Sequence, residues 1–432
     1  MTTRESGAAG RGRKQQNPKA QRVPGPGAQS TSHQPQPDQQ RIAIANEQMD
    51  ANAIDVIICR LPHNVLMLSG YSPVLGDSFL VYPRLGEPTL VVPESEETLA
   101  KTGWVRDIVT YHTPKASAGA VEDAVRPILA EICRDKGLAL LVIGFEVSFE
   151  SATSTYTQVG APSPSTMEMY RSVFPDANIV DAGPTLEQMG ISKTEREIDR
   201  IRIANEIAGF GLQAAREAIR PDASEGDVAA ATASAILSQG FGHKGVTRVI
   251  PFPHVMSGPR SADAYKPFNL TSNRRLEKRD FVLVQLEVYA DGYWAEVTRT
   301  FIVGEPSSIQ QRMYETCLEA QSRAIEAIGY GVKASIVDEV ARSYIAEQGY
   351  NGRFKHGLGH EVGFQAISHT RPPRLNPNSS DRLGPGQIHN LEPAIYIDGL
   401  GGLRINDTVL DLPRGAEYIS RIERSLAWVT CR

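Results

Sequence analysis

The chain has few cysteines, no excess of basic residues and no long apolar run, and each shortage excludes a class of protein. Four cysteines in 432 residues stand without CxxC spacing, at Cys59, Cys133, Cys317 and Cys431. We therefore expect reduced thiols, a cytoplasmic location and no cysteine-based zinc site. The formal net charge is −5, which disfavours nucleic acid and membrane surfaces as partners.

No apolar stretch approaches the roughly 20 residues that span a bilayer, and we expect no secretory signal because the first residues lack an apolar core. Residues 1–40 are rich in Gly, Pro, Gln, Ser and Arg and hold almost no large apolar side chains. Such a segment cannot bury enough surface to offset the entropy that ordering costs. We expect a disordered tail there, and a solvated extension is a simpler interpretation than a recruitment tail or a transit peptide.

The remaining chain is long enough for two domains, and 41% of the residues are hydrophobic. Between residues 41 and 190, helical patterns alternate with strand patterns, which predicts an α/β domain. The helical patterns lie at 41–53 and 121–136, and the strand patterns at 55–59, 78–82, 89–93 and 138–144. A second domain is expected at 191–432, where helical patterns begin at 194 and recur at 225–239, 308–328 and 336–348.

Polar residues with the chemistry of a small-molecule site gather in the second domain. His356 and His360 stand four apart within a glycine-rich run, where the backbone can approach a ligand closely. Glu392 precedes a proline, and Asn406 lies in an Arg-Ile-Asn-Asp stretch. Upstream, Gln285 and Glu296 stand eleven residues apart on expected strands. We expect these side chains to meet in one concave pocket.

The order of these motifs resembles the pita-bread superfamily (peptidase family M24), which includes prolidase, aminopeptidase P, methionine aminopeptidase, creatinase and ectoine hydrolase. The resemblance covers residues 41–432. It implies an α+β fold class: a C-terminal pita-bread fold, with a strongly bent antiparallel sheet and helices on its convex face, preceded by an N-terminal α/β creatinase-like domain. It also implies a homodimer.

Metal-dependent members of that family hold two divalent ions with five ligands, whose positions match Gln285, Glu296, His360, Glu392 and Asn406. Two of the four carboxylates are therefore amides here. Hard divalent cations favour anionic oxygen ligands, so we expect no dinuclear centre and, as the first choice, no cofactor. The alternative is one divalent ion (Mn, Zn, Fe or Co) on Glu296, His360 and Glu392.

The resemblance to creatinase suggests how such a site works without metal. Glu296 and Glu392 would act as general base or nucleophile, and His360 would transfer the proton. Tyr265 stands where creatinase has its acid–base histidine. His369 would be the second catalytic histidine if two residues are inserted before it.

Other side chains are expected to contact the substrate. His254 and His356 would reach the same cavity, together with Gln285 and Asn406. Arg404 would meet a carboxylate, and Arg260 would select an acidic group. For Arg299 a structural ion pair is the favoured interpretation.

Three functions remain open. The first is a C–N hydrolase of a small amino-acid-like substrate, similar to creatinase or ectoine hydrolase. The second is an Xaa-Pro-type metallopeptidase with a mononuclear site. The third is an inactive binding module on the same fold, which the surviving carboxylates disfavour because unpaired buried carboxylates are costly.

Overall fold

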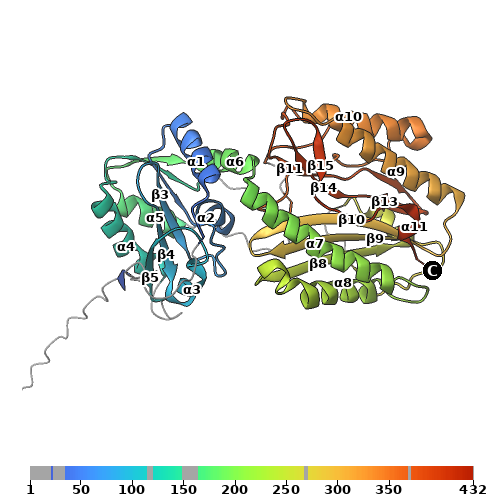
Figure 1. Ribbon diagram of the computed structural model, residues 1–432, viewed down its shortest axis with the longest axis horizontal. Helices are drawn as coiled ribbons and strands as arrows, with labels where there is room; N and C mark the ends of the chain where they lie inside the picture. Colours follow the sequence, from blue (N-terminus) through green and yellow to red (C-terminus); the bar gives the residue numbers. More distant parts are fainter. Residues whose placement is uncertain are drawn as a thin grey trace, which may run out of the picture.

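The computed structural model describes residues 21–22, 35–113, 120–147, 164–266, 271–367 and 371–431. They form two lobes (Figure 1). Most of the tail expected to be disordered, and His369, lie outside the described residues. In the described part of the chain, no helix is long and apolar enough to cross a membrane.

The first lobe is built on one seven-stranded mixed sheet with the order β1-β5-β4-β3-β2-β6-β7. Alternate residues of β2 explain why both faces are covered: Val56 and Ile58 face one apolar cluster, and Ile57 and Cys59 face the other. The strands are β1 Gln21–Arg22, β2 Val56–Cys59, β3 Phe79–Pro83, β4 Thr89–Pro93, β5 Asp107–Tyr111, β6 Val142–Phe145 and β7 Asn178–Asp181. The helices are α1 Gln39–Ala51, α2 Pro62–Ser69, α3 Glu97–Ala100, α4 Val121–Lys136, α5 Pro164–Val173 and α6 Gly183–Ile191, with the 3-10 turn η1 Glu94–Glu96.

The second lobe contains three smaller sheets with the orders β16-β10-β9-β8, β11-β14-β15 and β12-β13. Its strands are β8 Val249–Ser257, β9 Phe281–Ala290, β10 Tyr293–Val303, β11 Ile388–Leu391, β12 Ala394–Ile397, β13 Gly401–Arg404, β14 Asp407–Asp411, β15 Ala416–Tyr418 and β16 Thr430–Cys431. Its helices are α7 Glu195–Ala218, α8 Glu225–Gly240, α9 Ser308–Glu326, α10 Ala334–Ile345 and α11 Leu426–Val429. Short helical segments are η2 His243–Gly245, η3 Gly258–Asp263 and η4 Ala346–Tyr350.

Helix pairs cover the outer side of this lobe: α7 and α8 lie along β8–β10, and α9 and α10 lie over the other half (Figure 1). Local sequence sets where these helices begin. Thr194 caps α7 and Ser224 caps α8, each in a reciprocal capping box with the residue three positions later. The described residues therefore form the α+β arrangement expected from the motifs, with helices on the outer side of the second lobe.

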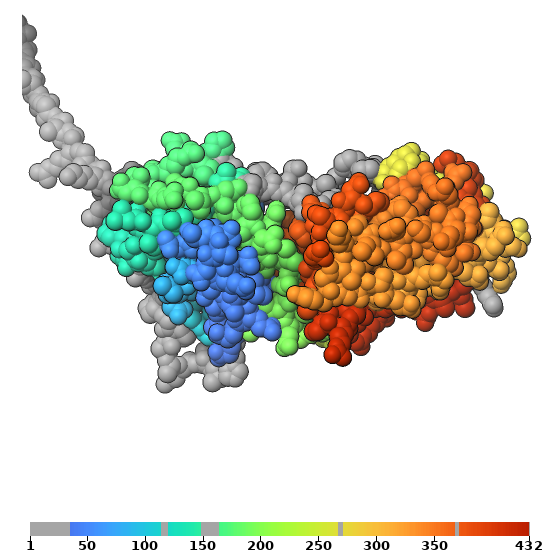
Figure 2. Space-filling view, turned by 90° about the horizontal axis from the view of Figure 1, so that it is seen from above, coloured from blue at the N-terminus to red at the C-terminus, as the bar shows by residue number. Residues whose placement is uncertain are grey.

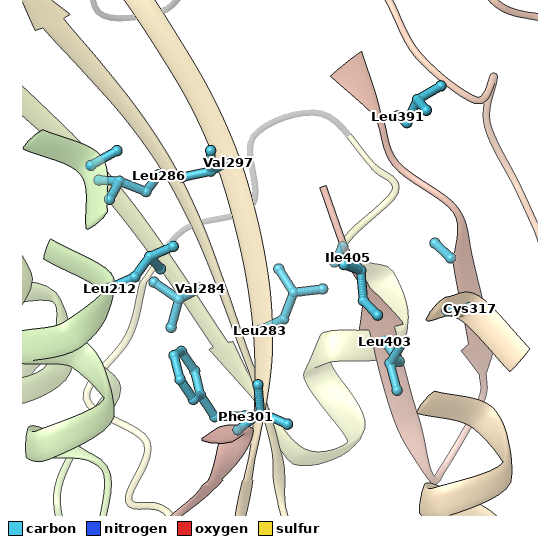
Figure 3. Close-up of a cluster of buried hydrophobic side chains, with 14 of the residues drawn as sticks. Leu212, Leu283, Val284, Leu286, Val297, Phe301, Cys317, Leu391, Leu403 and Ile405 are labelled. Carbon is cyan, nitrogen blue, oxygen red and sulfur yellow. The ribbon is translucent and has the colours of Figure 1, made fainter. Parts of the chain in front are cut away.

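The alternation along β9 decides which side chains reach the site. Val284 and Leu286 lie beside Leu212 of α7, whereas Leu283 points across toward Ile405 and the other half of the lobe (Figure 3). Because successive strand residues face opposite sides, the odd-numbered side chains of β9 line the inner face of the bent sheet.

Buried charged groups join the two lobes. Arg41 of α1 donates from Nε to Glu197 Oε1 at 2.9 Å and also contacts the carbonyl oxygen of Met189. Lys193, between α6 and α7, contacts the carboxylate of Glu361, and both side chains are fully buried. Seen from above, the green atoms of the connecting segment run between the first lobe and the orange and red atoms of the second (Figure 2).

Candidate active site

The strand register places polar residues in a first row across the inner face. On β8 and β9, His254 lies opposite Gln285. On β9 and β10, Gln285 lies opposite Thr298, and Thr298 forms a bridge with Asn406. Directly opposed residues in antiparallel strands project to the same face. The two amides, Gln285 and Asn406, therefore flank Thr298 in one row.

A second row, two residues further along each strand, carries the carboxylates. Glu287 lies opposite Glu296. Thr408 donates to the main-chain oxygen of Glu296 at 3.3 Å and lies opposite Asn390 of β11. Asn390 reaches over to donate from Nδ2 to Glu296 Oε2 at 2.8 Å. This bond holds the Glu296 carboxylate toward β11.

Three side chains from distant parts of the chain converge there. Ligand atoms of Glu296, His360 and Glu392 all lie within 4.8 Å of one another, and all three residues are buried. His360 Nε2 is 3.1 Å from Glu296 Oε2 and 3.9 Å from Glu392 Oε1. The central set predicted from the sequence is therefore brought together by the fold.

The hydrogen bond of Nδ1 determines which ring nitrogen of His360 carries a hydrogen. Nδ1 lies 3.0 Å from the carbonyl oxygen of Glu361, which can only accept, so Nδ1 carries a hydrogen. Nε2 then needs either a proton or a cation between itself and the carboxylates. Burial by itself lowers the pKa of His360, but the charge and hydrogen bond of Glu296, aided by Glu392, outweigh it and raise the pKa to about 10.

His356 borders the triad but is held differently. Its Nδ1 donates to the carbonyl oxygen of Gly357 at 2.8 Å, which leaves Nε2 to accept from the Tyr396 hydroxyl at 2.9 Å. Burial lowers the pKa of His356 to about 4, against the opposing charge of Glu392, whose Oε1 is 4.0 Å from Nδ1. His356 is therefore neutral at physiological pH.

Gln285 is bonded at both ends of its amide. Nε2 donates to Glu287 Oε1 at 2.6 Å and to Glu296 Oε1 at 3.3 Å. Oε1 accepts from Nη2 of Arg404, and Arg404 Nη1 lies 3.6 Å from Glu392 Oε2. On the far side, His254 Nε2 is 3.3 Å from Glu287 Oε2.

Two other predicted residues lie around rather than in this cluster. Tyr265 packs its ring against Tyr396, with the centroids 5.4 Å apart. Arg260 of η3 donates to Glu225 Oε2 at 2.5 Å and to Ser272 Oγ at 2.6 Å, so its guanidinium is engaged by a buried carboxylate of α8. Arg299 forms the buried ion pair with Asp407 that the structural interpretation anticipated.

Sequence reasoning missed Asn390, Thr298 and Tyr396. Asn390 had a usable signal, because it stands two residues before Glu392 and two-residue spacing on an extended segment predicts a shared face. Tyr396 had none, since it reaches His356 only through the tertiary fold.

The donor chemistry fits one divalent ion. Two carboxylates and one imidazole converge, and such a set suits Zn, Mn, Fe or Co. Asn406 supports an inward-facing polar site, because neither side-chain polar atom of this fully buried residue has a hydrogen-bond partner among the described residues. Gln285 does not fit as a ligand, since its nitrogen faces the carboxylates and its oxygen is bound by Arg404.

Most of the chain matches known protein families and individual relatives. Residues 199–410 match the model of metallopeptidase family M24, and residues 41–190 match the creatinase/prolidase N-terminal domain. The Xaa-Pro dipeptidase of Pyrococcus furiosus is 32% identical over 378 residues, which cover 88% of this chain and 97% of that protein.

Solved structures confirm the pita-bread fold class that was expected from the motifs. The prolidase of Pyrococcus horikoshii OT3 superposes with a TM-score of 0.71 at 29% identity, covering 90% of this chain and 99% of that one. The Xaa-Pro dipeptidase of Bacillus anthracis gives a TM-score of 0.72 at 26% identity, again covering 90% and 99%.

These matches correct one expectation. The prediction that the site needs no cofactor is wrong, because the matched family is a metallopeptidase family and the structure gathers a candidate metal-binding triad. The two amide substitutions led to that error, because they made the absence of a cofactor the first choice and left one divalent ion on Glu296, His360 and Glu392 as the alternative, which the findings favour. The geometry shows that Glu296, His360 and Glu392 converge without help from either amide position.

Proposed function

The chain belongs to metallopeptidase family M24 and is a C–N bond hydrolase of that superfamily, and we propose that its substrate is a small peptide of the Xaa-Pro type. We further propose that one divalent ion is held by Glu296, His360 and Glu392. The observation that carries the proposal is the convergence of these three buried side chains within 4.8 Å. The 32% identity to an Xaa-Pro dipeptidase along nearly its full length supports the choice of substrate.

The bound ion would supply Lewis-acid polarisation of the scissile carbonyl. The remaining work falls to side chains of the chain itself. Glu296 is committed to Asn390 and Gln285 by hydrogen bonds. Among the described residues, the carboxylate of Glu392 has longer contacts, to Arg404 at 3.6 Å, His360 at 3.9 Å and His356 at 4.0 Å. Glu392 would hold the ion through one carboxylate oxygen, and its other oxygen is the better candidate to take a proton from the attacking water.

Arg404 would orient negative charge on the substrate. Its Nε has no hydrogen-bond partner among the described residues, although the side chain is buried. A buried donor without a partner costs about 1–3 kcal/mol, and a substrate oxygen would remove this cost. Neutral His356, held by Tyr396, would border the substrate without adding charge.

The other proposals made from the sequence stand as follows. The comparisons give no specific support to a creatinase or ectoine hydrolase activity. A homodimer and a cytoplasmic location stay predictions.

A direct test measures hydrolysis of Ala-Pro and Met-Pro against Ala-Ala and Pro-Ala, with Mn²⁺, Co²⁺ or Zn²⁺ added to stripped protein. We expect turnover of the Xaa-Pro peptides only. Glu296→Gln should lower kcat/KM by roughly 10²–10⁴. Glu277→Gln is the matched control, because this side chain is 78% exposed and lies outside the triad. Absence of Xaa-Pro hydrolysis with all three metals would refute the substrate assignment.

A further inference from the structure

The amide nitrogen of Gln285 lies against the carboxylates of Glu287 and Glu296, and its oxygen accepts from Arg404. We infer that this site holds one divalent ion and that the Gln285–Arg404 pair takes the place of a second one. The inference rests on the metal site of the proposed function and is independent of the substrate.

The side-chain amide of Gln285 is oriented with its nitrogen toward two carboxylates. Its Nε2 lies 2.6 Å from one carboxylate oxygen of Glu287 and 3.3 Å from one of Glu296. An N–H group between two carboxylates satisfies them as a cation would, and it cannot coordinate a metal. A second ion would have to displace this donor from both carboxylates.

Arg404 locks that orientation. Its Nη2 donates to Gln285 Oε1, and a guanidinium has only donors. Turning the amide over would set two donors against each other at Arg404 and an oxygen against the carboxylates of Glu287 and Glu296. Both ends of the amide thus oppose the flip that would present an oxygen to an ion.

The local charges lead to the same count of ions. Glu287, Glu296 and Glu392 contribute three negative charges, and Arg404 contributes one positive charge. His356 adds no charge, because its Nδ1 donates to the Gly357 carbonyl and its Nε2 accepts from the Tyr396 hydroxyl. His360 adds none when its Nε2 binds the ion in place of a proton. The sum is −2, which one divalent ion cancels. Two ions would leave a net charge of +2 among buried side chains, and an uncompensated buried charge is strongly unfavourable.

Asn406 lies in the first row on the other side of Thr298 from Gln285, and it also lacks a charge. It lies across from Thr298, and its buried side chain is neutral. Neither polar atom of its amide has a partner among the described residues. A carboxylate at this position would add a negative charge with which to hold a second ion, and the neutral amide adds none.

The experiment titrates metal-stripped full-length protein with Mn²⁺ and counts the bound ions by calorimetry and native mass spectrometry. Electron paramagnetic resonance gives a separate readout, because an isolated Mn²⁺ and a pair of neighbouring ions give different spectra. We expect saturation at one equivalent and the spectrum of an isolated ion. Saturation at two equivalents, or no binding at all, would overturn the inference.

Variants test the role assigned to the amides. The double variant Gln285→Asp with Asn406→Glu should bind two equivalents and show coupled ions. Gln285→Asp alone should take up a second equivalent that the unaltered chain does not bind, and it serves if the double variant does not fold. Asn390→Asp adds the same charge beside Glu296 outside the Gln285–Arg404 pair, so it should stay at one equivalent.

If the double variant and Gln285→Asp both stay at one equivalent, or if Asn390→Asp also takes up two, the role assigned to Gln285 is wrong. These outcomes are separate from the peptide assay. One bound ion without Xaa-Pro hydrolysis would remove the substrate proposal and keep this inference. Two bound ions with Xaa-Pro hydrolysis would do the reverse.

Discussion

Replacing Arg299 by methionine should destabilise the second lobe more than almost any other single change. Arg299 of β10 is fully buried, and its guanidinium joins three separate segments. Nη2 donates to Asp407 Oδ1 at 2.7 Å and to the Ile422 carbonyl at 3.0 Å, and Nε donates to the Glu423 carbonyl at 3.0 Å. Nη1 donates to the carbonyls of Thr298 and Asn406, each at 2.9 Å.

The loss in the free energy of unfolding is estimated from the polar groups that lose Arg299 as their partner. Methionine fills a similar volume but satisfies none of the four carbonyl oxygens. Asp407 would keep the Ser420 hydroxyl at 2.7 Å and a distant Arg424 at 3.6 Å. Breaking a buried ion pair by removing one partner costs about 3–5 kcal/mol. We therefore expect Arg299→Met to lower the free energy of unfolding by about 4 kcal/mol.

Urea unfolding followed by tryptophan fluorescence would measure this. Trp428 packs against the core of the second lobe, whereas Trp104 and Trp294 lie in the apolar cluster that both lobes share. Replacing Trp104 and Trp294 by phenylalanine in every variant leaves Trp428 as the reporter of the second lobe. Adding Asp407→Leu to Arg299→Met removes the stranded carboxylate and should recover part of the loss. A loss under about 1 kcal/mol for Arg299→Met, with no recovery in the double variant, would refute the reasoning.

Three further predictions follow from other contacts. Lys193→Met leaves the buried carboxylate of Glu361 with the more distant Arg371 at 4.0 Å. A shift of Glu361 would disturb the bond from His360 Nδ1 to its carbonyl oxygen, so Mn²⁺ affinity should fall roughly 10–100-fold in calorimetry, while Lys193→Arg should retain more of it. Glu392→Gln should lower kcat/KM on Xaa-Pro peptides by roughly 10²–10⁴, through kcat more than KM, in steady-state assays. Burial would raise the pKa of Glu225, but hydrogen bonds from Ser272, Ser257 and Arg260 outweigh it and lower the pKa. Its contribution to stability is therefore full above the unfolded value of about 4.3 and is lost as pH falls through the lower folded pKa. Glu225→Gln should thus weaken the protein at neutral pH and flatten the acid limb of its stability-against-pH curve, as thermal melts would show.

Helix and strand positions in this chain were predictable where the pattern was local. The helical pattern at 121–136 coincides with α4 Val121–Lys136, and the strand pattern at 89–93 with β4 Thr89–Pro93. The pattern at 138–144 began too early, because β6 starts at Val142. Leu138 is buried there without being in a strand, so its apolar side chain extended the apparent run.

The central site was predictable because its residues carry chemistry in motifs. Glu296, His360 and Glu392 were singled out from the sequence, and the fold brings them within 4.8 Å. Arg260 and Tyr265 were singled out on the same grounds, yet each contacts other partners. A sequence position shows that a side chain is polar, but its direction depends on the strand register and on which partner is nearest.

By itself, the sequence determined the family, the two-part architecture and the identity of the three converging side chains. Local propensity, two-residue alternation and motif order are all properties of neighbouring residues, and a single chain records them directly. Only the tertiary structure decided how Gln285 points. Its amide is turned by Arg404 on one side and by Glu287 and Glu296 on the other, and Arg404 comes from a strand 119 residues away. The proposed number of bound ions depends on that orientation, because an amide nitrogen satisfies carboxylates and an amide oxygen binds cations.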